Sequence, residues 1–496
     1  MRNIEYKLSD NELRLIKNCN WIFTLLLTLV VLLLTSCESL LEEEPRLVAE
    51  ESFYNTALEV ETAVNAIYEP LRKLPDAGLV GINSALGEFC YGRGSWSWLN
   101  NYDGLNGTWI TRTSNMWAPL YLGIRNANLV VLNLSNNTVL SPEVNQELLG
   151  EARFLRAFAY FNLIKNWGAV PLRTEENLEL TDIARSPINE VYEQIIIDLN
   201  YAEANLPDNE RLRGAPSKWV AKTLLADVYL SMENFTEASN KANEVIQSGK
   251  YALLPIETTD DYQNIFSAGV AKNSEEIFYA LYTHDQGFGS VWPGLLNHPG
   301  TGFYANSGVY GVHGDSTNPA YMNWDDNDLR KGLWYPWEFG VSPTTLLSKK
   351  FIDPETLGLD RGSNPVTLYR YADLLLIYAE ADSKVNGVTE SSMEALNQVH
   401  RRAYGFDPIN SSPVDFSVQD YDSNTFVDLI IKERGYEFQL EGKRWPELKR
   451  TGKADEIIMD IRGKSLSEKN YLWPIPINEF NFNLALDPAT DQNPGY

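Results

Sequence analysis

The sequence predicts a mainly α-helical protein built on tetratricopeptide-like helix pairs, with one loop-rich, aromatic-rich insertion that carries short strands. Apolar residues recur at helical spacing before residue 250 and again after residue 366. Between these blocks, Gly, Pro, Asn, Asp and aromatic residues replace that spacing. We therefore expect one α domain over 51–496, with a helical scaffold at 51–250 and 366–496 and a variable insertion at 251–365.

The N-terminus has the pattern of an exported lipoprotein. Residues 21–34 form an apolar run without charge, shorter than the roughly 20 residues that span a bilayer, and this fits the core of a secretory signal. The Leu-Thr-Ser-Cys sequence that ends at Cys37 resembles a bacterial lipobox, in which cleavage precedes an acylated cysteine. We expect 1–36 to be a lipoprotein signal peptide and Cys37 to carry the lipid. An uncleaved membrane helix is the alternative, and the small residues before Cys37 favour cleavage.

The segment after the cysteine, 37–50, is expected to be an acidic tether. Its run of Glu42, Glu43 and Glu44 before Pro45 looks like the export tag of Bacteroidetes-type lipoproteins that are placed on the outside of the outer membrane. An ordinary solvated linker is the alternative. The tag favours a protein that faces the cell exterior.

Charge and cysteine content restrict the ligand and the redox chemistry. The formal charge of −26 repels nucleic-acid phosphates and anionic lipid head groups, so no nucleic-acid partner is expected and a neutral ligand fits better. Of the three cysteines, Cys19 lies in the signal and Cys37 would be acylated, which leaves Cys90 and no internal disulfide. No base lies near Cys90 in the sequence, so we expect a packed thiol.

Helical periodicity places four helices before the repeat. The segment that ends at Trp167 is the strongest, and Gly168 followed by Pro171 closes it. Ser186-Pro187 supplies an N-cap and first-turn pair for the next helix. The expected helices are 56–72, 115–134, 146–167 and 188–205.

Residues 219–249 have the spacing of a tetratricopeptide helix pair. The small Ala226 and Ala238 let two helices approach, and Tyr229 and Phe235 fill the space beside them. Because this match lies in a run of helices of similar length, several degenerate repeats are expected.

After the insertion, helical spacing resumes. Alternating prolines in 471–478 forbid a helix there, so that tail is expected to be extended. The expected helices are 367–386, 390–404 and 425–441.

A set of stretches in fixed order supports a family resemblance. Glu433-Arg-Gly-Tyr-Glu-Phe438, Tyr471-Leu-Trp-Pro-Ile-Pro476 and the terminal Gln492-Asn-Pro-Gly-Tyr496 are three of them. With these stretches and the lipobox, the chain resembles a SusD/RagB-type outer-membrane nutrient-binding lipoprotein. The other matching stretches are 151–163, 168–172, 219–249, 370–381 and 441–445.

The resemblance implies a scaffold of about four tetratricopeptide-like pairs with a variable, loop-rich half. It also implies a partner, a TonB-dependent outer-membrane barrel of the SusC type, over which the lipoprotein would sit as a lid. Members bind glycans or, in the RagB branch, peptides. The expected function is capture of an oligosaccharide or polysaccharide and its delivery to the barrel by a lipid-anchored outer-membrane protein, with peptide import as the alternative.

No motif for catalysis, a cofactor or a metal is present in the sequence. There is no Gly-x-Ser-x-Gly elbow, no phosphate-binding loop and no His-Glu-x-x-His. Asp325, Asp326 and Asp328 lack the spacing of a calcium loop. We therefore expect no enzyme, no cofactor and no metal, with a surface hydrolase or a purely protein-binding adaptor as weaker alternatives.

The Glu433, Glu437 and Glu441 set could be mistaken for an acid/base site. At i, i+4 spacing the three side chains share one helix face, whereas a glycosidase pair must flank a cleft. An internal network with Arg434 and Arg444 that fixes helix packing is favoured.

Two aromatic-rich segments are the candidate ligand site. A sugar ring has an apolar C–H face that an aromatic ring can cover and a polar edge that Asn or Arg can bind. If 91–103 is locally extended, Trp96 and Trp98 project the same way. The two segments, 91–103 and 284–340, are expected to meet across a shallow groove, with Trp96 or Trp98 facing Trp292 or Trp324. The candidate ligand-binding residues are Trp96, Trp98, Asn101 and Arg93 in the turn, and Trp292, Tyr304 and Trp324 in the insertion.

Overall fold

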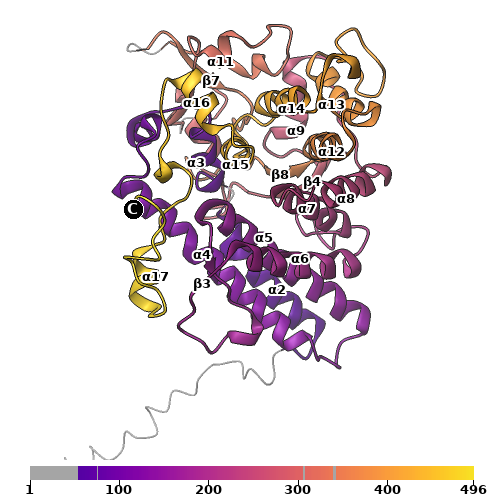
Figure 1. Ribbon diagram of the computed structural model, residues 1–496, viewed down its shortest axis with the longest axis vertical. Coiled ribbons are helices and arrows are strands. Elements are labelled where there is room, and N and C mark those ends of the chain that lie inside the picture. The colour runs from indigo at the N-terminus through magenta and orange to yellow at the C-terminus, as the bar shows by residue number, and fades with distance from the viewer. Residues whose placement is uncertain (1–53, 75, 305–307, 339–341) are drawn as a thin grey trace, which may run out of the picture. The chain divides into compact units, whose positions relative to one another are not determined.

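The computed structural model describes residues 54–74, 76–304, 308–338 and 342–496 (Figure 1). The expected signal peptide 1–36, the tether 37–50 and the lipid site Cys37 lie outside the described residues. Within the described part, helices dominate and strands are few and short, so the mainly α-helical fold class is confirmed.

The first part of the scaffold is a row of antiparallel helices in which successive members pack on one another: α2 on α4, α4 on α5, α5 on α6, α6 on α7, and α7 on α8. The expected pair at 219–249 is confirmed as α7 and α8. The bounds are α2 Ala57–Arg72, α3 Leu79–Ala85, α4 Gly107–Leu134, α5 Pro142–Trp167, α6 Ile188–Asn205, α7 Lys218–Ser231 and α8 Phe235–Gln247.

Two helices of this row begin earlier than predicted, α5 at Pro142 and, by the larger margin, α4. α4 begins at Gly107 rather than at residue 115, because the Asn106 side chain accepts a hydrogen bond from the Trp109 amide at 3.2 Å and caps the helix. The added turns carry Trp109, whose side chain is fully buried. The N-terminal end of α4 therefore contributes to the core beside the 91–103 turn.

The second part of the scaffold closes against the first, since α12 packs on α8. α14 ends at Glu437 rather than at residue 441, and Leu440 just beyond it has a left-handed backbone with φ of 64°. The bounds are α12 Tyr371–Asn386, α13 Glu390–Ala403, α14 Ser423–Glu437, α15 Arg444–Arg450, α16 Ala454–Arg462 and α17 Ile477–Phe482.

The insertion contains short strands, as expected, and also short helices that were not predicted. A four-stranded sheet has the order β1-β5-β7-β6, and its β1–β5 pairing joins Tyr91 to His313. The strand bounds are β1 Tyr91–Gly92, β2 Val170–Pro171, β3 Arg185–Ser186, β4 Glu276–Ala280, β5 Val312–Asp315, β6 Trp334–Pro336, β7 Thr345–Ser348 and β8 Val366–Arg370, and the short helices are α9 Gln263–Phe266, α10 Trp292–Leu296 and α11 Pro319–Met322.

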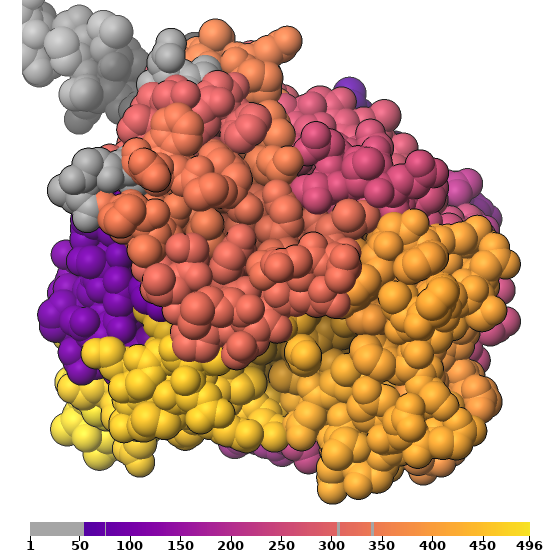
Figure 2. All heavy atoms as spheres, turned by 90° about the horizontal axis from the view of Figure 1, so that it is seen from above, coloured from indigo at the N-terminus to yellow at the C-terminus, as the bar shows by residue number. Residues whose placement is uncertain are grey.

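The sheet explains how the insertion meets the N-terminal part of the domain. β1 lies in the 91–103 turn region and its partner β5 lies in the insertion, so backbone pairing brings the two segments together. In Figure 2 the insertion covers the middle of the face shown and borders the indigo N-terminal segment. The expectation that these two segments meet in space is therefore confirmed at the level of the backbone.

A buried ion network connects α14 to the insertion. Glu437 accepts hydrogen bonds from Arg370 and Arg402, and from Arg330 of the insertion at 3.0 Å. Glu441 pairs with Lys350 at 2.7 Å. All of these side chains are buried, so the acidic set is internal, as predicted. Its cations are not Arg434 and Arg444, which pair with Glu447 instead.

Candidate functional site

The 91–103 turn is a 3₁₀ helix, η2 (Gly94–Asn101), rather than an extended segment. A 3₁₀ helix has three residues per turn, so Trp96 and Leu99 share one face and are buried, while Trp98 and Asn101 share another face and are exposed. The expectation that Trp96 and Trp98 project the same way is therefore wrong. Only one of the two rings is open to a ligand.

Trp98 forms part of the wall of a shallow depression of about 500 Å³. Its side chain is 36% exposed, and its indole Nε1 donates to the carbonyl of Gly104 at 2.9 Å, which fixes the ring at the surface. Polar side chains surround the ring. The depression is lined by Gly94, Ser95, Ser97, Trp98, Asn100, Asn101, Asn106 and Thr108.

Some of the polar residues hold the walls and others are available. The Asn100 side chain binds both backbone groups of Gly92, at 2.7 and 2.9 Å, and Asn106 caps α4. Among the residues that the structure describes, the side chains of Asn101 and Thr108 form no hydrogen bond, and both are exposed. The site thus combines a rigid frame, one exposed indole face and uncommitted amide and hydroxyl groups.

Arg93 links this depression to a second aromatic group. It is the N-cap residue of η2, its amide donates to the carbonyl of Gly311 at 2.8 Å, and its guanidinium lies 3.9 Å from the ring centre of Tyr310. The ring of His298 lies 5.0 Å from that of Tyr310 and 5.5 Å from that of Trp337. All three rings are half-buried. A partly exposed aromatic surface therefore continues from η2 into the insertion.

Four of the predicted ligand-binding residues lie in the core instead. Trp292 and Tyr304 are 0% exposed, Trp324 is 2% exposed and Trp96 is 5% exposed. Rings without an open face cannot stack on a sugar, so assigning these four side chains to the site is wrong for this structure. Trp98, Asn101 and Arg93 lie at the surface.

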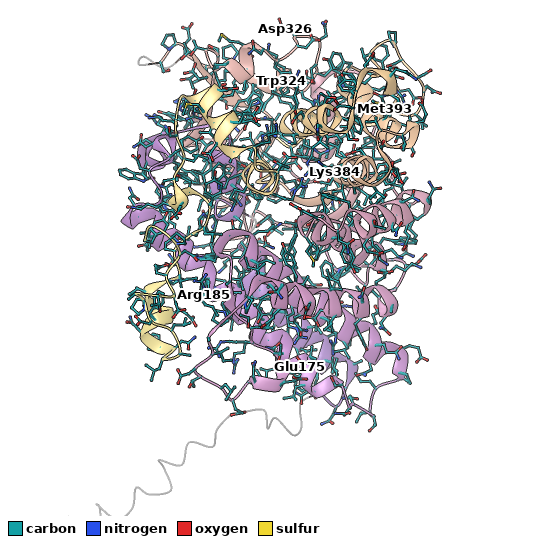
Figure 3. All side chains as sticks on the ribbon, viewed as in Figure 1. Glu175, Arg185, Trp324, Asp326, Lys384 and Met393 are labelled. Atoms are coloured by element: carbon teal, nitrogen blue, oxygen red, sulfur yellow. The ribbon has the colours of Figure 1, made fainter. Side chains whose placement is uncertain are left out.

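The buried rings pack on one another and on the scaffold. Trp96 and Trp292 do face each other, with ring centres 6.4 Å apart, but inside the core rather than across an open groove. Trp324 stacks on Tyr436 of α14 at 4.3 Å, and its Nε1 donates to Asp328 at 2.8 Å. Figure 3 shows Trp324 within the upper part of the ribbon.

Tyr310, His298 and Trp337 are site residues that the sequence did not predict. Tyr310 and Trp337 belong to the aromatic-rich insertion, but residues outside a regular helix or strand have no periodicity that separates an exposed ring from a buried one. The sequence around His298 has no motif that indicates a binding role. Pairing of β1 with β5 is what brings Tyr310 beside Arg93.

The insertion contains a Ser-His-Asp cluster, but its geometry is not that of a hydrolase. The His284 Nε2 atom lies 2.9 Å from Asp353 Oδ2 and 3.0 Å from Ser363 Oγ. A catalytic triad uses one imidazole nitrogen for the acid and the other for the nucleophile. Here both groups compete for the same nitrogen, so the cluster holds loops together.

Other chemistry is equally restricted. Burial raises the pKa of the Cys90 thiol to about 12, which keeps it protonated and confirms a packed thiol. Asp328 is occupied by Arg330 at 2.6 Å, while Asp326 points outward at the edge of the molecule (Figure 3). The described part of the chain has no cluster of three or more His, Cys, Asp or Glu side chains placed to hold a metal ion.

Comparisons with known proteins decide the family. A sequence model of the SusD family matches residues 338–496, and one described as "Starch-binding associating with outer membrane" matches residues 48–230. SusD-like protein P2 of Formosa agariphila is 28% identical over 95% of this chain and 99% of its own. The chain is a SusD/RagB-type protein. Both matches cover helices of the scaffold.

Solved structures show that this SusD/RagB-type chain shares the fold of its family. A SusD homolog from Bacteroides thetaiotaomicron superposes with a TM-score of 0.75 at 22% identity, covering 90% of this chain and 98% of that one. A structure titled "Laminarin binding SusD-like protein" gives 0.69 at 24% identity, covering 88% and 99%. Among the described residues of this SusD/RagB-type protein, no helix combines the length and the apolar character that a membrane span requires.

Proposed function

We propose that this chain is a non-catalytic carbohydrate-binding protein of the outer membrane, and that it binds an oligosaccharide or polysaccharide at Trp98. The observation that carries the proposal is the depression in which one exposed indole face stands among uncommitted amide and hydroxyl groups. This pairing matches the two surfaces of a sugar ring, since the indole covers the C–H face and Asn101 and Thr108 bind hydroxyl groups at its edge.

The charge of the site fits a neutral glycan. The residues that line the depression are all uncharged, although the whole chain has a net charge of −26. Arg93 stands beside the depression and is stacked on Tyr310. A chain of sugars longer than the depression would extend from Trp98 across Arg93 toward the half-buried rings of Tyr310 and Trp337.

The relatives support a carbohydrate rather than a peptide. One family description names starch binding and association with the outer membrane, and one structural neighbour is titled as laminarin-binding. Neither name fixes the glycan of this chain, because ligand choice in a shared fold depends on the site residues.

The proposal includes an anchor and a partner. Acylation of Cys37 would hold the chain on the outer membrane, and the acidic segment after it would direct the chain to the exterior. There it would deliver glycan to a TonB-dependent barrel of the SusC type. A Cys37→Ala variant, or treatment with globomycin, should leave an uncleaved precursor. Cleavage and membrane attachment of the Cys37→Ala chain would contradict the anchor.

Affinity measurements on the mature chain test the glycan site. Laminarin and amylopectin are the first probes, and a pool of short peptides is the comparison arm. Trp98→Ala should weaken glycan binding by about 1–3 kcal/mol, taking the loss of a stacked base as the guide, while leaving the melting temperature nearly unchanged. Phe482→Ala, which removes a ring that is 80% exposed on α17, is the matched control and should bind normally.

Two results would overturn carbohydrate binding without catalysis, and a third would overturn the site at Trp98. The first is retention of peptides with no retention of any polysaccharide in a panel of neutral and acidic glycans. The second is release of new reducing ends from a bound polysaccharide by the purified, folded chain, because this would make the chain a hydrolase. Unchanged glycan affinity in Trp98→Ala would move the site elsewhere.

A further inference from the structure

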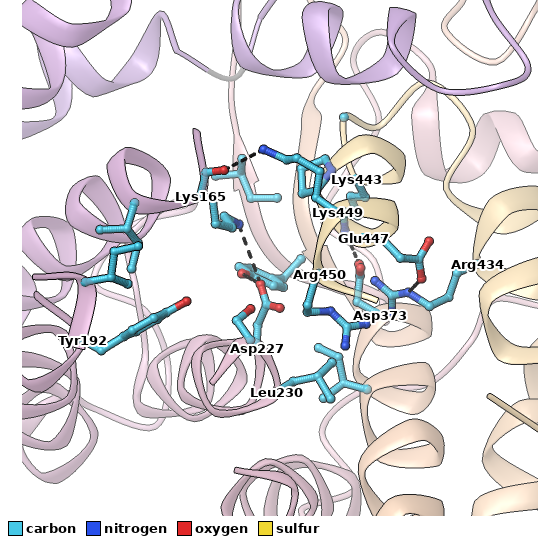
Figure 4. A pocket seen from close by; sticks show the side chains of 18 of the residues that line it. Lys165, Tyr192, Asp227, Leu230, Asp373, Arg434, Lys443, Glu447, Lys449 and Arg450 are labelled. Carbon is cyan, nitrogen blue, oxygen red and sulfur yellow. Dashed lines mark hydrogen bonds and ion pairs between the residues drawn. The ribbon is translucent and has the colours of Figure 1, made fainter. Parts of the chain in front are cut away.

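A second cavity lies within the helical scaffold and shares no lining residue with the depression beside Trp98. It has a volume of about 430 Å³, within the range of small-molecule sites. Its walls come from α5, α6, α7, β8, α12, α14 and α15 and from the tail at Tyr471 and Leu472. Figure 4 shows Tyr192 on one side, Arg434 on the opposite side, and Lys165 and Lys449 between them.

The cavity combines apolar walls with a dense set of charges. Ile164, Ile188, Leu230, Ile377 and Leu472 provide apolar surface. Charged and titratable groups face the cavity from every element of its walls. They are Lys165 (α5), Tyr192 (α6), Asp227 (α7), Tyr369 (β8), Asp373 (α12), Arg434 (α14), Lys443 (just before α15), Glu447, Lys449 and Arg450 (α15) and Tyr471 (the tail). Glu380 of α12 lies directly behind Arg450.

The acidic groups are nearly all engaged. Glu447 pairs with Arg434, and Asp373 pairs with Lys443. The carboxylate of Glu380 accepts two hydrogen bonds from Arg450, at 2.6 and 2.8 Å. The remaining acid, Asp227, accepts a hydrogen bond from the Tyr369 hydroxyl and lies 3.9 Å from the Lys165 ammonium.

Lys449 is the cation of the cavity that has no acidic partner in these pairs. Its Nζ donates to the carbonyls of Lys165 and Tyr471, at 2.8 and 2.9 Å, and no acidic side chain among the described residues pairs with it. An ammonium has three N–H donors, so one donor remains. Lys449 is half-buried, and a charge partly withdrawn from water without an opposite charge is costly, so a bound anion would lower that cost.

We propose that this cavity binds a small organic carboxylate, with its carboxyl group on Lys449 and Lys165 and its body against the apolar walls. Lys165 is poised for this because its contact with Asp227 is long. The Arg450 guanidinium, which would suit a bidentate anion, is held by both carboxylate oxygens of Glu380. Arg434 binds Glu447 through Nε and keeps a buried Nη1 without a hydrogen-bond partner among the described residues, on the side of the cavity opposite Tyr192 (Figure 4). Lys165 and Lys449 lie between these two sides, so we place the carboxyl group on their ammonium groups.

Binding should take up a proton near neutral pH. Burial, and then the nearby Lys165 charge, lower the pKa of Lys449 to about 7, and burial also lowers the pKa of Lys165. A bound carboxylate favours the ammonium form and so raises the pKa of Lys449. Affinity should therefore be highest below pH 7 and fall as the pH rises toward 8, where binding must take up nearly one proton.

A structural alternative makes opposite predictions. The Lys165 carbonyl is one of the last carbonyls of α5, which lack partners within the helix, so Lys449 could serve only as a cap that ties the tail to α5. In that case Lys449→Met should lower the melting temperature and the cavity should bind no acid. Two of the three ammonium donors suffice for the cap, which leaves the third for a ligand.

Calorimetry on the mature chain distinguishes a carboxylate-binding cavity from a purely structural cap. The probes are glucuronate and cyclohexanecarboxylate, which distinguish a hydroxylated body from an apolar one, with methyl glucoside and cyclohexylmethanol as neutral counterparts. At least one acid should bind at pH 6 with saturation, and neither neutral compound should bind in this cavity. In buffers of different ionisation enthalpy, binding at pH 8 should take up close to one proton and binding at pH 5.5 almost none.

Variants assign the effect to the two lysines. Lys449→Met and Lys165→Met should each weaken acid binding at least tenfold, while Lys449→Arg should keep binding and lose its pH dependence between 6 and 8. Lys384→Met, an exposed lysine of α12 that does not line the cavity, is the matched control. Failure of both acids to saturate, binding at pH 8 without proton uptake, or full binding by Lys449→Met would overturn the proposal.

Discussion

The scaffold and the insertion both contain tryptophans, but the sequence predicts which of them are buried only in the scaffold. In the scaffold, Trp117 and Trp167 stand at helical spacing with other apolar residues, and both are buried. In the insertion, Trp292 and Trp324 have no such context, and they are buried as deeply. Trp337, also in the insertion, is only half-buried. Aromatic richness in a loop region thus does not by itself indicate a ligand surface.

The reason is that a loop-rich insertion must build its own core. Without helical stripes of Leu and Ile, it fills space with large rings, as Trp324 does by stacking on Tyr436 of α14. Trp292 serves the same purpose by donating from its indole to the carbonyl of Leu440 at 2.9 Å. These rings attach the insertion to the scaffold. The rings that remain exposed, such as Trp98, are those that the local backbone turns outward.

The largest expected effect concerns the buried network where the two regions join. Glu437→Gln removes a negative charge that faces Arg330, Arg370 and Arg402. Leaving buried guanidinium groups without it should cost about 3–5 kcal/mol in the free energy of unfolding. Urea denaturation followed by circular dichroism measures this. A loss below about 1 kcal/mol would show that the insertion does not depend on the network.

Trp324→Ala tests whether the insertion's rings act as core. It should lower the free energy of unfolding by about 3 kcal/mol through the lost burial and the cavity left behind. Glycan affinity should be unchanged at temperatures where the variant is folded. The reverse pattern, with normal stability and lost affinity, would restore Trp324 to the ligand site.

Acid should weaken the same network. The Arg330 and His400 partners hold the pKa of Glu433 at about 2, and those of Glu437 well below the usual range, although burial alone would raise both. Such carboxylates stabilise the fold fully above pH 4.5 and lose that contribution as the pH falls toward 2. Glu433 alone should account for roughly 2 kcal/mol lost by pH 3, measured as a shift in urea midpoint. A flat profile from pH 7 to 3 would contradict the coupling.

The scaffold could be predicted from the sequence because its signals are local and periodic. Helix bounds at α2, α6 and the α7–α8 pair follow from spacing and caps. The site could be predicted only in part. Composition predicts Trp98, Asn101 and Arg93, but it does not predict the 3₁₀ geometry that buries Trp96. Nor does it predict the β1–β5 pairing that places Tyr310 beside Arg93, which joins residues more than 200 positions apart in the chain.

A smaller effect tests whether the depression and the rings of the insertion form one surface. Arg93→Ala removes the guanidinium stacked on Tyr310. It should weaken binding of a long glycan by about 0.5–1.5 kcal/mol, the net worth of one hydrogen bond from the guanidinium to a sugar hydroxyl, and leave a short oligosaccharide unaffected. Arg125→Ala, at an exposed position of α4, is the control. Equal losses for short and long ligands would confine the site to the depression.

Oxidative footprinting of the tryptophans tests the central claim most directly. N-bromosuccinimide would be added to the mature chain with and without saturating laminarin or whichever polysaccharide it retains, and oxidation at each tryptophan would be quantified by mass spectrometry. We expect Trp98 to be oxidised readily in the free protein and protected by the glycan, with Trp292 and Trp324 unreactive in both samples. Oxidation of Trp98 that is unchanged by saturating glycan would contradict the account.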